Sequence, residues 1–479
     1  MPKIVLLWTD VVVLGLVLLL MFYGWRVLKM PIQRARWFKV FSDAPALCST
    51  LLLLLFMVPT LLDSMHFRTL LPVAPGSAAG SAAAYDTRTQ SLLDVVLRPL
   101  IERRESSYSA PLAYRGFVKQ TSLEPGKLGR DFPRLAFGGA HLKDPATEWL
   151  PDLLQRGAVG LVCGALLALL GALALGRFHG RGRAVPLAQA LRELAQDRSD
   201  LPLRALLITW GVVSLLVGVT LSLASGYHVL GTDRTGNDVL YQALKSIRTA
   251  FVIGALATLA TLPFAIALGV MAGYFKGWVD ELIQYIYTVL SSVPFILLIA
   301  ACVLMMQVYI DKHAELFETG AERADVRIFL LCVIVGVTGW AGLCRLLRGE
   351  TLKLRELDYV QAATAFGVSH WRIMVLHILP NVMHLVLITT VLSFSDLILF
   401  EAVLSYIGIG VDPSMNSFGG MINQARGEIA RDPMIWWSFA AAFVFMVALV
   451  LAANLFSDGV RDAFDPRARS LRPRLAAAK

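Results

Sequence analysis

Stretches of mostly apolar residues recur along almost the whole chain, separated by shorter polar segments. Each stretch holds about eighteen or more residues, enough for a helix to cross about 30 Å of hydrocarbon. The apolar positions are continuous and do not alternate with polar ones, which predicts membrane-spanning helices and excludes a barrel. We expect spans at residues 4–23, 45–62, 154–175, 206–225, 249–274, 282–306, 328–346, 381–404 and 435–456. The hydropathy pattern therefore predicts an all-α, multi-pass membrane protein.

Composition and charge support this class. Of the 479 residues, 56% are hydrophobic and 16% are charged, whereas a soluble domain carries about 25% charged residues. Many of the lysines and arginines behind the net charge of +9 lie in loops at residues 24–44, 176–205 and 345–372 and in the last residues, 457–479. Basic loops of this kind face the cytoplasm, so we expect no nucleic-acid partner. An odd number of spans then places the N-terminus outside and the C-terminus in the cytoplasm.

The longest polar segment, residues 63–152, separates the second and third expected spans. Because the basic loop before the second span is expected in the cytoplasm, that span would run outward and place this segment on the periplasmic side. Residues 73–84 are rich in Pro, Gly, Ser and Ala, which is typical of a flexible linker. Residues 91–104 carry apolar side chains at helical spacing and predict an amphipathic helix. We interpret the segment as an insertion that packs on the membrane domain.

Several motifs of enzymes and metalloproteins are absent from the sequence. There is no Gly-x-x-x-x-Gly-Lys-Ser/Thr phosphate loop, so we do not expect this chain to hydrolyse ATP. There is also no His-Glu-x-x-His or Gly-x-Ser-x-Gly motif, and we predict no catalytic residue and no bound cofactor. The five cysteines form no Cys-x-x-Cys pair and are interpreted as packing residues. His370, His377 and His384 recur at regular spacing, but Pro380 is expected to break the helix between them, so we predict no metal site.

Three carboxylates fall within expected spans. A charge at mid-depth that faces lipid costs about 2.5–3.5 kcal/mol, so each needs a partner, a watery cavity or a position near the membrane surface. Asp10 is near the start of the first span, and we expect it to reach the interface. Asp396 and Glu401 are five residues apart and point to different sides of a regular helix. They line a translocation pathway, cap backbone groups or act as a proton relay.

A short polar segment, residues 358–367, lies in the basic loop between the seventh and eighth spans. Its composition predicts a helix of about three turns. Ala362 and Ala363 would let another protein approach closely, and Gly367 offers the left-handed conformation that ends a helix. Pro380 suits the first turn of the next span. The apolar side chains expected to enter a groove of a soluble partner are Leu357, Val360 and Phe366. The alternative is a helix that rests on the bilayer.

Four separated motifs occur in order in the second half of the chain. The first is His-Val-Leu-Gly-Thr-Asp-Arg-Thr-Gly-Asn-Asp-Val-Leu at residues 228–240, and the second is Gly-Tyr-Phe-Lys-Gly-Trp-Val-Asp-Glu at residues 273–281. The third is Gln-Ala-Ala, Gly and Leu-Pro within residues 361–380, and the fourth comprises residues 401–411 and 458–466. Together they resemble the membrane-spanning subunits of binding-protein-dependent, ATP-driven importers, most closely the second permease of the oligopeptide, dipeptide and nickel group.

This resemblance implies a fold and a division of the chain. A six-span permease core of the type I importer class would occupy residues 204–467, with a coupling helix near residues 356–368. Residues 1–62 would be two extra spans, 63–152 the periplasmic insertion, 153–203 a third extra span with its basic loop, and 468–479 a cytoplasmic tail.

The resemblance also implies a cellular place and partners. The protein would be a multi-pass subunit of the bacterial inner membrane, surrounded by lipid. It would work with a sister permease, two cytoplasmic ATPase subunits that use ATP and Mg²⁺, and a periplasmic solute-binding protein. The insertion would then offer a docking surface for that binding protein.

The family's site residues map onto two regions. ATPase coupling falls on Asp358, Gln361, Ala362, Ala363, Gly367, Leu379 and Pro380. The outer-face motif comprises Gly231, Thr232, Asp233, Gly236 and Asp238. The chain departs from the family's pattern at Gln361, where a glutamate is usual, and at Tyr285 and Thr288, where the family often has arginine and aspartate. An ion pair expected there is missing or replaced.

We therefore expect this chain to be half of a heterodimeric translocation path for di- or oligopeptides. Metal chelates, glutathione and peptide antibiotics remain open as solutes. A reading of a different class is an ion-coupled secondary transporter with Asp396 and Glu401 as its proton site, although the internal repeat usual in such proteins is not visible. A membrane scaffold or sensor built on the insertion is a third reading.

Overall fold

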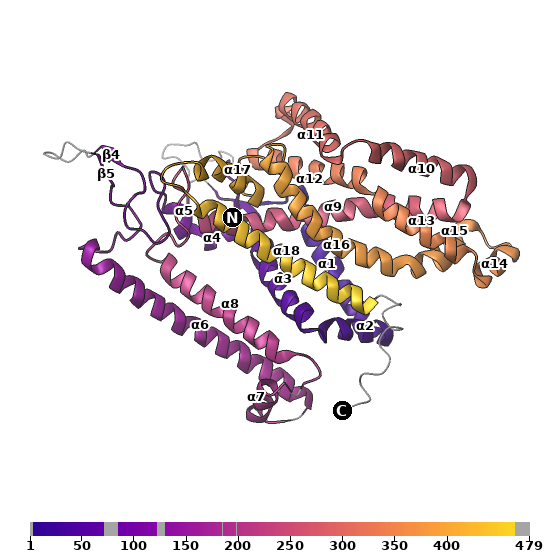
Figure 1. Cartoon of the computed structure of the whole chain (residues 1–479), viewed down its shortest axis with the longest axis horizontal. Coiled ribbons are helices and arrows are strands. Elements are labelled where there is room, and N and C mark those ends of the chain that lie inside the picture. Colours follow the sequence, from indigo (N-terminus) through magenta and orange to yellow (C-terminus); the bar gives the residue numbers. More distant parts are fainter. Residues whose placement is uncertain (1–2, 71–84, 122–129, 184, 198, 465–479) are drawn as a thin grey trace, which may run out of the picture.

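Long helices dominate the computed structural model of this chain (Figure 1). The structure describes residues 3–70, 85–121, 130–183, 185–197 and 199–464. Within these residues, 8 helices are long and apolar enough to cross a membrane, or 9 if α12 (Gly320–Gly339) and α13 (Ala341–Arg355), which meet at a bend of 41°, form one span. The all-α, multi-pass class predicted from the hydropathy pattern is confirmed.

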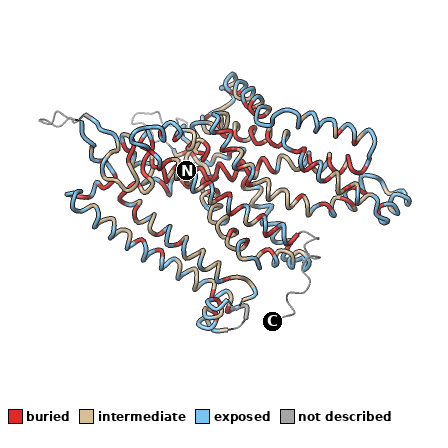
Figure 2. Tube along the Cα trace, viewed as in Figure 1, coloured by how far each residue is buried: buried red, intermediate tan, exposed pale blue. Residues whose placement is uncertain are grey.

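Helix α9 (Val239–Phe275) forms the centre of the main bundle. It begins at Asp238, whose carboxylate accepts hydrogen bonds from the backbone N–H groups of Leu240 and Tyr241 at 2.8 and 3.3 Å. These bonds satisfy donors that the first helical turn leaves open. Figure 2 shows that buried residues gather along α9 and its neighbours. The helices packed around it include α12, α13, α3 (Ala44–Asp63), α16 (Leu379–Tyr406) and α18 (Trp437–Phe464).

The N-terminal helices pack on this bundle. Helix α1 (Trp8–Lys29) lies against α9 and α12, and α2 (Pro31–Phe41) lies against α18. We expected α8 (Leu203–Ala224) to be the first helix of the core, but α8 packs mainly along α6 (Pro145–Arg183). It is α3 that contacts α9 and α18. The core boundary at residue 204 stays a prediction, and the packing favours α3 over α8 as the first core helix.

Glycines allow α6 and α8 to pack closely as a hairpin. A side chain at Gly160 would meet the Cα atom of Val219 at 2.6 Å, and one at Gly164 would meet the carbonyl oxygen of Ser214 at 2.7 Å. Small residues of this kind let helix backbones approach each other in a membrane. Helix α7 (Leu187–Ala195) follows α6 at the far end of the hairpin.

The insertion is built from short elements. A three-stranded antiparallel sheet joins β1 (Lys3–Val5), β2 (His66–Arg68) and β3 (Gln90–Ser91), and β4 (Gln120–Thr121) pairs with β5 (Arg130–Asp131). In place of the single amphipathic helix expected at residues 91–104, the chain forms α4 (Leu92–Val96) and α5 (Arg98–Glu102). Pro99 lies in the first turn of α5, a position that proline favours and that begins a new helix. The predicted linker at residues 73–84 and the tail at 468–479 lie outside the described residues.

Two further predictions need correction, and two short elements were not expected. The span expected at residues 282–306 is two helices, α10 (Gly277–Ser292) and α11 (Phe295–Lys312), because Pro294 interrupts it. A short 3₁₀ turn, η1 (Ala314–Leu316), and helix α17 (Phe418–Ile429) were not expected. Pro380 does not break the helix before it, since α15 (His370–Ile373) continues through a π-helical turn, η2 (Met374–Ile378), into α16.

Candidate functional sites at the two ends of the bundle

The predicted coupling segment forms a separate corner at the end of the bundle opposite the insertion (Figure 1). It contains α14 (Asp358–Ala365), which has eight residues and so about two turns instead of three. Gly367 has φ +75° and ends the helix as predicted. Its N–H donates to the Thr364 carbonyl at 3.0 Å, and the N–H of Val368 donates to the Ala363 carbonyl at 3.1 Å.

One face of α14 is held by the bundle. Val360 is 1% exposed and belongs to a buried cluster with Tyr274, Leu347 and Ile373. The expectation that Val360 would contact a partner is therefore wrong, because the direction of this face depends on helices distant in sequence. Ala363 and Leu379 pack against the same cluster.

The opposite face of α14 is open. Phe366 is 87% exposed and Leu357 is 44% exposed, while Asp358, Gln361, Ala362 and Pro380 are also exposed. The Gln361 amide donates to the Glu356 carbonyl at 3.2 Å. A hollow of about 470 Å³ lies beside the helix. Its lining residues are Tyr274, Phe275, Arg355, Glu356, Gln361, Thr364, Ala365 and His370.

A few polar contacts fasten this corner to the end of α9. The His370 imidazole Nδ1 lies 2.8 Å from the Tyr274 hydroxyl, and the Arg355 guanidinium donates to the Tyr274 carbonyl at 2.5 Å. Lys276 and Glu356 form an ion pair of 2.7 Å with both side chains largely exposed. The His384 imidazole Nδ1 lies 2.8 Å from the Asn381 carbonyl oxygen on its own helix.

An ion pair does connect the inner-turn motif to α13. Arg348 donates to both carboxylate oxygens of Asp280, at 2.6 and 2.7 Å. Tyr285 and Thr288, where the family often has charged residues, are both exposed. Asp280 lies within the predicted motif at residues 273–281, but its arginine partner was not recognised.

At the other end of the bundle, the outer-face motif forms a buried turn. Gly231 and Gly236 have φ of +74° and +79°, and a side chain on Gly236 would collide with the Glu105 carbonyl of the insertion. Asp233 accepts from the backbone N–H groups of Thr235 and Asn237, at 2.8 and 2.9 Å. The positive φ values and the close approach explain why glycines stand here.

This turn is bonded to the insertion and to α18. The hydroxyl of Thr232 accepts from the Ser109 backbone N–H at 2.7 Å, and the Trp437 indole donates to the Thr232 carbonyl at 2.9 Å. Motif residues Gly231, Thr232, Asp233, Gly236 and Asp238 are all buried. The motif therefore positions the insertion on the bundle.

A buried histidine joins the insertion to the start of α9. His228 lies 2.8 Å from Asp238 and 3.5 Å from Glu105. Glu105 also accepts backbone hydrogen bonds from residues 136–138. Burial alone would lower the pKa of His228, but these two carboxylates raise it to about 9. For Glu105 the directions are reversed. Burial alone would raise its pKa, but His228 and the backbone donors lower it to about 2. The insertion is thus held by charged groups at neutral pH.

Beside this turn lies a cavity of about 870 Å³. The insertion, the loop after Asp233, and α17 with the loop before it contribute to its wall. The two expected pathway carboxylates do not come together there. Glu401 is 1% exposed and accepts from the Ser405 hydroxyl at 2.6 Å, whereas Asp396 is exposed on another side of α16.

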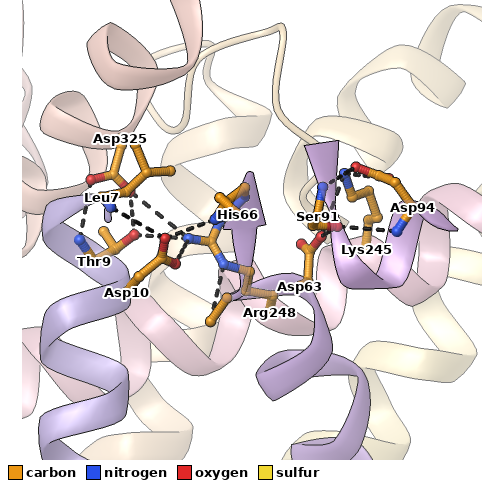
Figure 3. A network of polar contacts seen from close by, with 11 residues as sticks. Leu7, Thr9, Asp10, Asp63, His66, Ser91, Asp94, Lys245, Arg248 and Asp325 are labelled. Atoms are coloured by element: carbon orange, nitrogen blue, oxygen red, sulfur yellow. Dashed lines mark hydrogen bonds and ion pairs between the residues drawn. The ribbon is translucent and has the colours of Figure 1, made fainter. Parts of the chain in front are cut away.

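A network of charges at this end was missed by the sequence analysis (Figure 3). Arg248 of α9 donates to Asp10 of α1 at 2.6 Å and lies 3.9 Å from Asp325 of α12. His66 contacts the other oxygen of Asp10 at 2.7 Å. Asp10 is thus fully buried and paired, and the expectation that it reaches the interface is wrong.

The same network continues to the insertion. Lys245 lies 2.8 Å from Asp94 of α4 and 3.5 Å from Asp63 of α3. Ser91 donates to Asp63 at 2.6 Å. Lys245 and Arg248 stand three residues apart near the start of an apolar span, and this spacing was the one available signal in the sequence.

Comparison with known proteins gives a consistent picture. Residues 265–470 match the family model "Binding-protein-dependent transport system inner membrane component". The chain is 33% identical over 245 residues to the oligopeptide transport system permease protein OppC of Mycobacterium tuberculosis (strain ATCC 25618 / H37Rv), which covers 51% of this chain and 78% of that protein.

Two further relatives carry other names. Identity is 33% over 246 residues with the glutathione transport system permease protein GsiD of Pectobacterium atrosepticum, covering 51% of this chain and 75% of the relative. It is 28% over 245 residues with the dipeptide transport system permease protein DppC of Bacillus subtilis, covering 51% and 70%. The resemblance predicted from the four motifs is confirmed. The chain belongs to the family of inner-membrane permease components of binding-protein-dependent transport systems.

Proposed function

We propose that this chain is one of two permease subunits of an ATP-driven importer of peptides. In this proposal α14 is the contact for an ATPase subunit, and a solute-binding protein delivers solute at the insertion end. The chain has no phosphate loop of its own. The relatives are named for oligopeptide, glutathione and dipeptide transport, which supports a peptide-like solute. The N-terminus would then lie outside and the C-terminus in the cytoplasm.

The observation that carries this proposal is the two-faced environment of α14. Val360 is fixed in the bundle, while Phe366 projects outward beside the open hollow. Burying such a phenylalanine in a partner's groove contributes about 1.5–3 kcal/mol. A push on the open face would pass through Val360 to the helices packed behind it, which include α9, α13 and η2. A helix held on one face and open on the other can transmit force without breaking the hydrogen bonds of the spans.

The ion-coupled alternative finds less support. A proton relay needs titratable groups within reach of each other or of shared water. Asp396 and Glu401 lie on different sides of α16, one exposed and the other buried against Ser405. We propose instead that Asp396 faces the sister permease or the translocation path. Solute uptake that persists without ATP and collapses with the proton gradient would favour the alternative.

Co-purification of ATPase subunits with the full-length chain tests the proposal. Phe366→Ala should lose these subunits because it removes the most exposed apolar side chain of the α14 corner. Phe178→Ala is the matched control, since Phe178 is 79% exposed on α6, a helix that packs on α8 and α7. Loss from the first variant alone supports the coupling role. Equal recovery of the ATPase subunits with both variants would overturn it.

A further inference from the structure

The cavity at the insertion end has the size and lining of a binding site for a small polar solute. Its volume of about 870 Å³ lies in the range of about 300–1,000 Å³ that is usual for ligand sites. Tyr108 of the insertion forms part of the wall, so the insertion helps to shape the cavity. Asn423 and Gln424 of α17 add carboxamide groups that can bond peptide N–H and C=O groups.

Every carboxylate that lines the cavity already has partners. Asp233 accepts from two backbone N–H groups and from the Gln242 amide. Asp412 accepts from Arg327 at 2.5 Å and from the Ser414 N–H at 2.9 Å. Glu428 accepts from the Tyr108 hydroxyl at 2.6 Å. Asp412 is therefore paired with a cation, whereas Asp233 and Glu428 accept hydrogen bonds from neutral donors.

Two arginines on the same wall have no such partner. Arg234 and Arg431 are exposed and line the cavity. Among the described residues, neither guanidinium has a carboxylate within ion-pair distance. The Arg431 guanidinium lies 5.6 Å from the centre of the Tyr108 ring. Burial raises the pKa of Glu428, and the charges of Arg431 and Arg234 oppose that rise. Both guanidinium groups are therefore free to bind a carboxylate that enters the cavity.

We propose that Arg234 and Arg431 form a subsite for the carboxylate of the transported solute. A guanidinium presents N–H donors in a planar fork that matches a carboxylate, and such charge-assisted bonds are stronger than neutral ones. The subsite rests on the proposed import function and deepens it, because it selects solutes with a free acid group, such as peptides with an unblocked C-terminus.

Tyr108 has a supporting role in this arrangement. Its hydroxyl donates a hydrogen bond to the Glu428 carboxylate. Without this bond, the carboxylate would be available to pair with Arg431. Tyr108→Phe keeps the ring but frees the Glu428 carboxylate. We expect it to weaken binding of a free acid and to leave binding of the corresponding amide unchanged. A purely structural role of Tyr108 would weaken both.

Binding of trialanine and of trialanine C-terminal amide to the full-length chain in lipid nanodiscs tests the subsite. The wild type should bind the acid about tenfold more tightly than the amide, the difference expected for one charge-assisted bond. Arg234→Gln and Arg431→Gln should each reduce this ratio, and the double variant should bring it close to one. Arg426→Gln is the control. Arg426 belongs to α17, which contributes to the cavity wall, but Arg426 itself does not line the cavity.

Several outcomes would overturn the subsite. These are equal binding of acid and amide by the wild type, no binding of either, or an unchanged ratio in the double variant. The wild type could also bind acid and amide equally while the double variant fails to capture the solute-binding protein. In that case the arginines bind the solute-binding protein, and the subsite is wrong. None of these results needs an ATPase partner. Co-purification of ATPase subunits with a chain that shows no acid preference would leave the import function standing without the subsite.

Discussion

The Arg248–Asp10 pair at the insertion end and the Lys276–Glu356 pair at the α14 corner differ in burial. At the insertion end, Arg248 is 4% exposed and its partner Asp10 is fully buried. At the α14 end, Lys276 and Glu356 are 45% and 60% exposed. The first pair joins helices from distant parts of the chain, while the second joins two neighbouring surface turns. We infer that the first end is a fixed anchor and the second a corner that a partner can move.

The physical basis of this contrast is solvation. Breaking a buried ion pair leaves an uncompensated charge in a medium that solvates it poorly, so the arrangement resists change. When an exposed ion pair separates, water solvates both charged groups at little cost in free energy. Such pairs can therefore open and close during a conformational cycle. Lys245 and Arg248 tie α9 to both N-terminal spans and to the insertion. Helices α1 and α3 are in this sense part of the same bundle as α9.

The largest effect should come from Arg248→Met, which keeps much of the side chain's length but removes its charge. Asp10 and Asp325 would then share one site with only His66 beside it. We expect a loss of about 3–5 kcal/mol in the free energy of unfolding, measured as a lower melting temperature and a lower yield of folded chain. Arg98→Met is the control, because Arg98 is largely exposed and pairs only with Glu102. Equal melting temperatures of the two variants would contradict the anchor.

A smaller effect is expected from titration of His228. Its pKa is raised from 6.5 to about 9 in the folded chain. A raised pKa gives stability that is fully present below pH 6.5 and is lost as the pH rises through about 9. The shift corresponds to up to about 3 kcal/mol. The melting temperature of the wild type should therefore fall between these pH values.

His228→Gln should flatten that fall, because it removes the titrating group while keeping hydrogen-bonding capacity. His313→Gln is the control, since the exposed His313 imidazole lies 2.9 Å from the Tyr309 carbonyl oxygen at the end of α11. A pH profile that is the same in His228→Gln and in the wild type would show that the histidine does not hold the insertion.

The smallest effect belongs to the α14 end. Lys276→Ala removes the exposed ion pair with Glu356. In the wild type, the hydrogen bond and the charge of Lys276 lower the pKa of the Glu356 carboxyl. Because both groups are solvated with or without each other, we expect no measurable change in melting temperature. A drop comparable with that of Arg248→Met would remove the distinction between a fixed end and a movable one.

Local features of the fold could be predicted from the sequence, whereas long-range ones could not. Hydropathy located the spans because each depends on its own residues. The αL turn at Gly367 was predicted for the same reason, and the observed φ of +75° confirms it. The break at Pro294 was not predicted, although the proline is visible in the sequence, because the apolar stretch continues on both sides of it.

The pairing of Asp10 with Arg248 joins residues 238 positions apart, and no local pattern marks it. The same holds for Val360, whose face is chosen by helices far away in the chain. The motif at residues 228–240 was recognised in the sequence, but its contact with Ser109 and Glu105 depends on an insertion that the family motif does not describe. The packing of α3 in place of α8 is likewise a choice between two equally apolar spans.

Uptake of labelled trialanine in cells that carry Gly367→Val tests whether α14 is a lever driven by an ATPase. Valine at a positive φ costs about 1–3 kcal/mol of local strain. A Cβ there meets no atom within 4 Å, so the strain is confined to the turn. Gly15→Val on α1 is the control, because it too meets no atom but keeps a helical backbone. If α14 is such a lever, we expect normal amounts of both variants in the membrane and loss of ATP-driven uptake in Gly367→Val alone. Full uptake by Gly367→Val would contradict it.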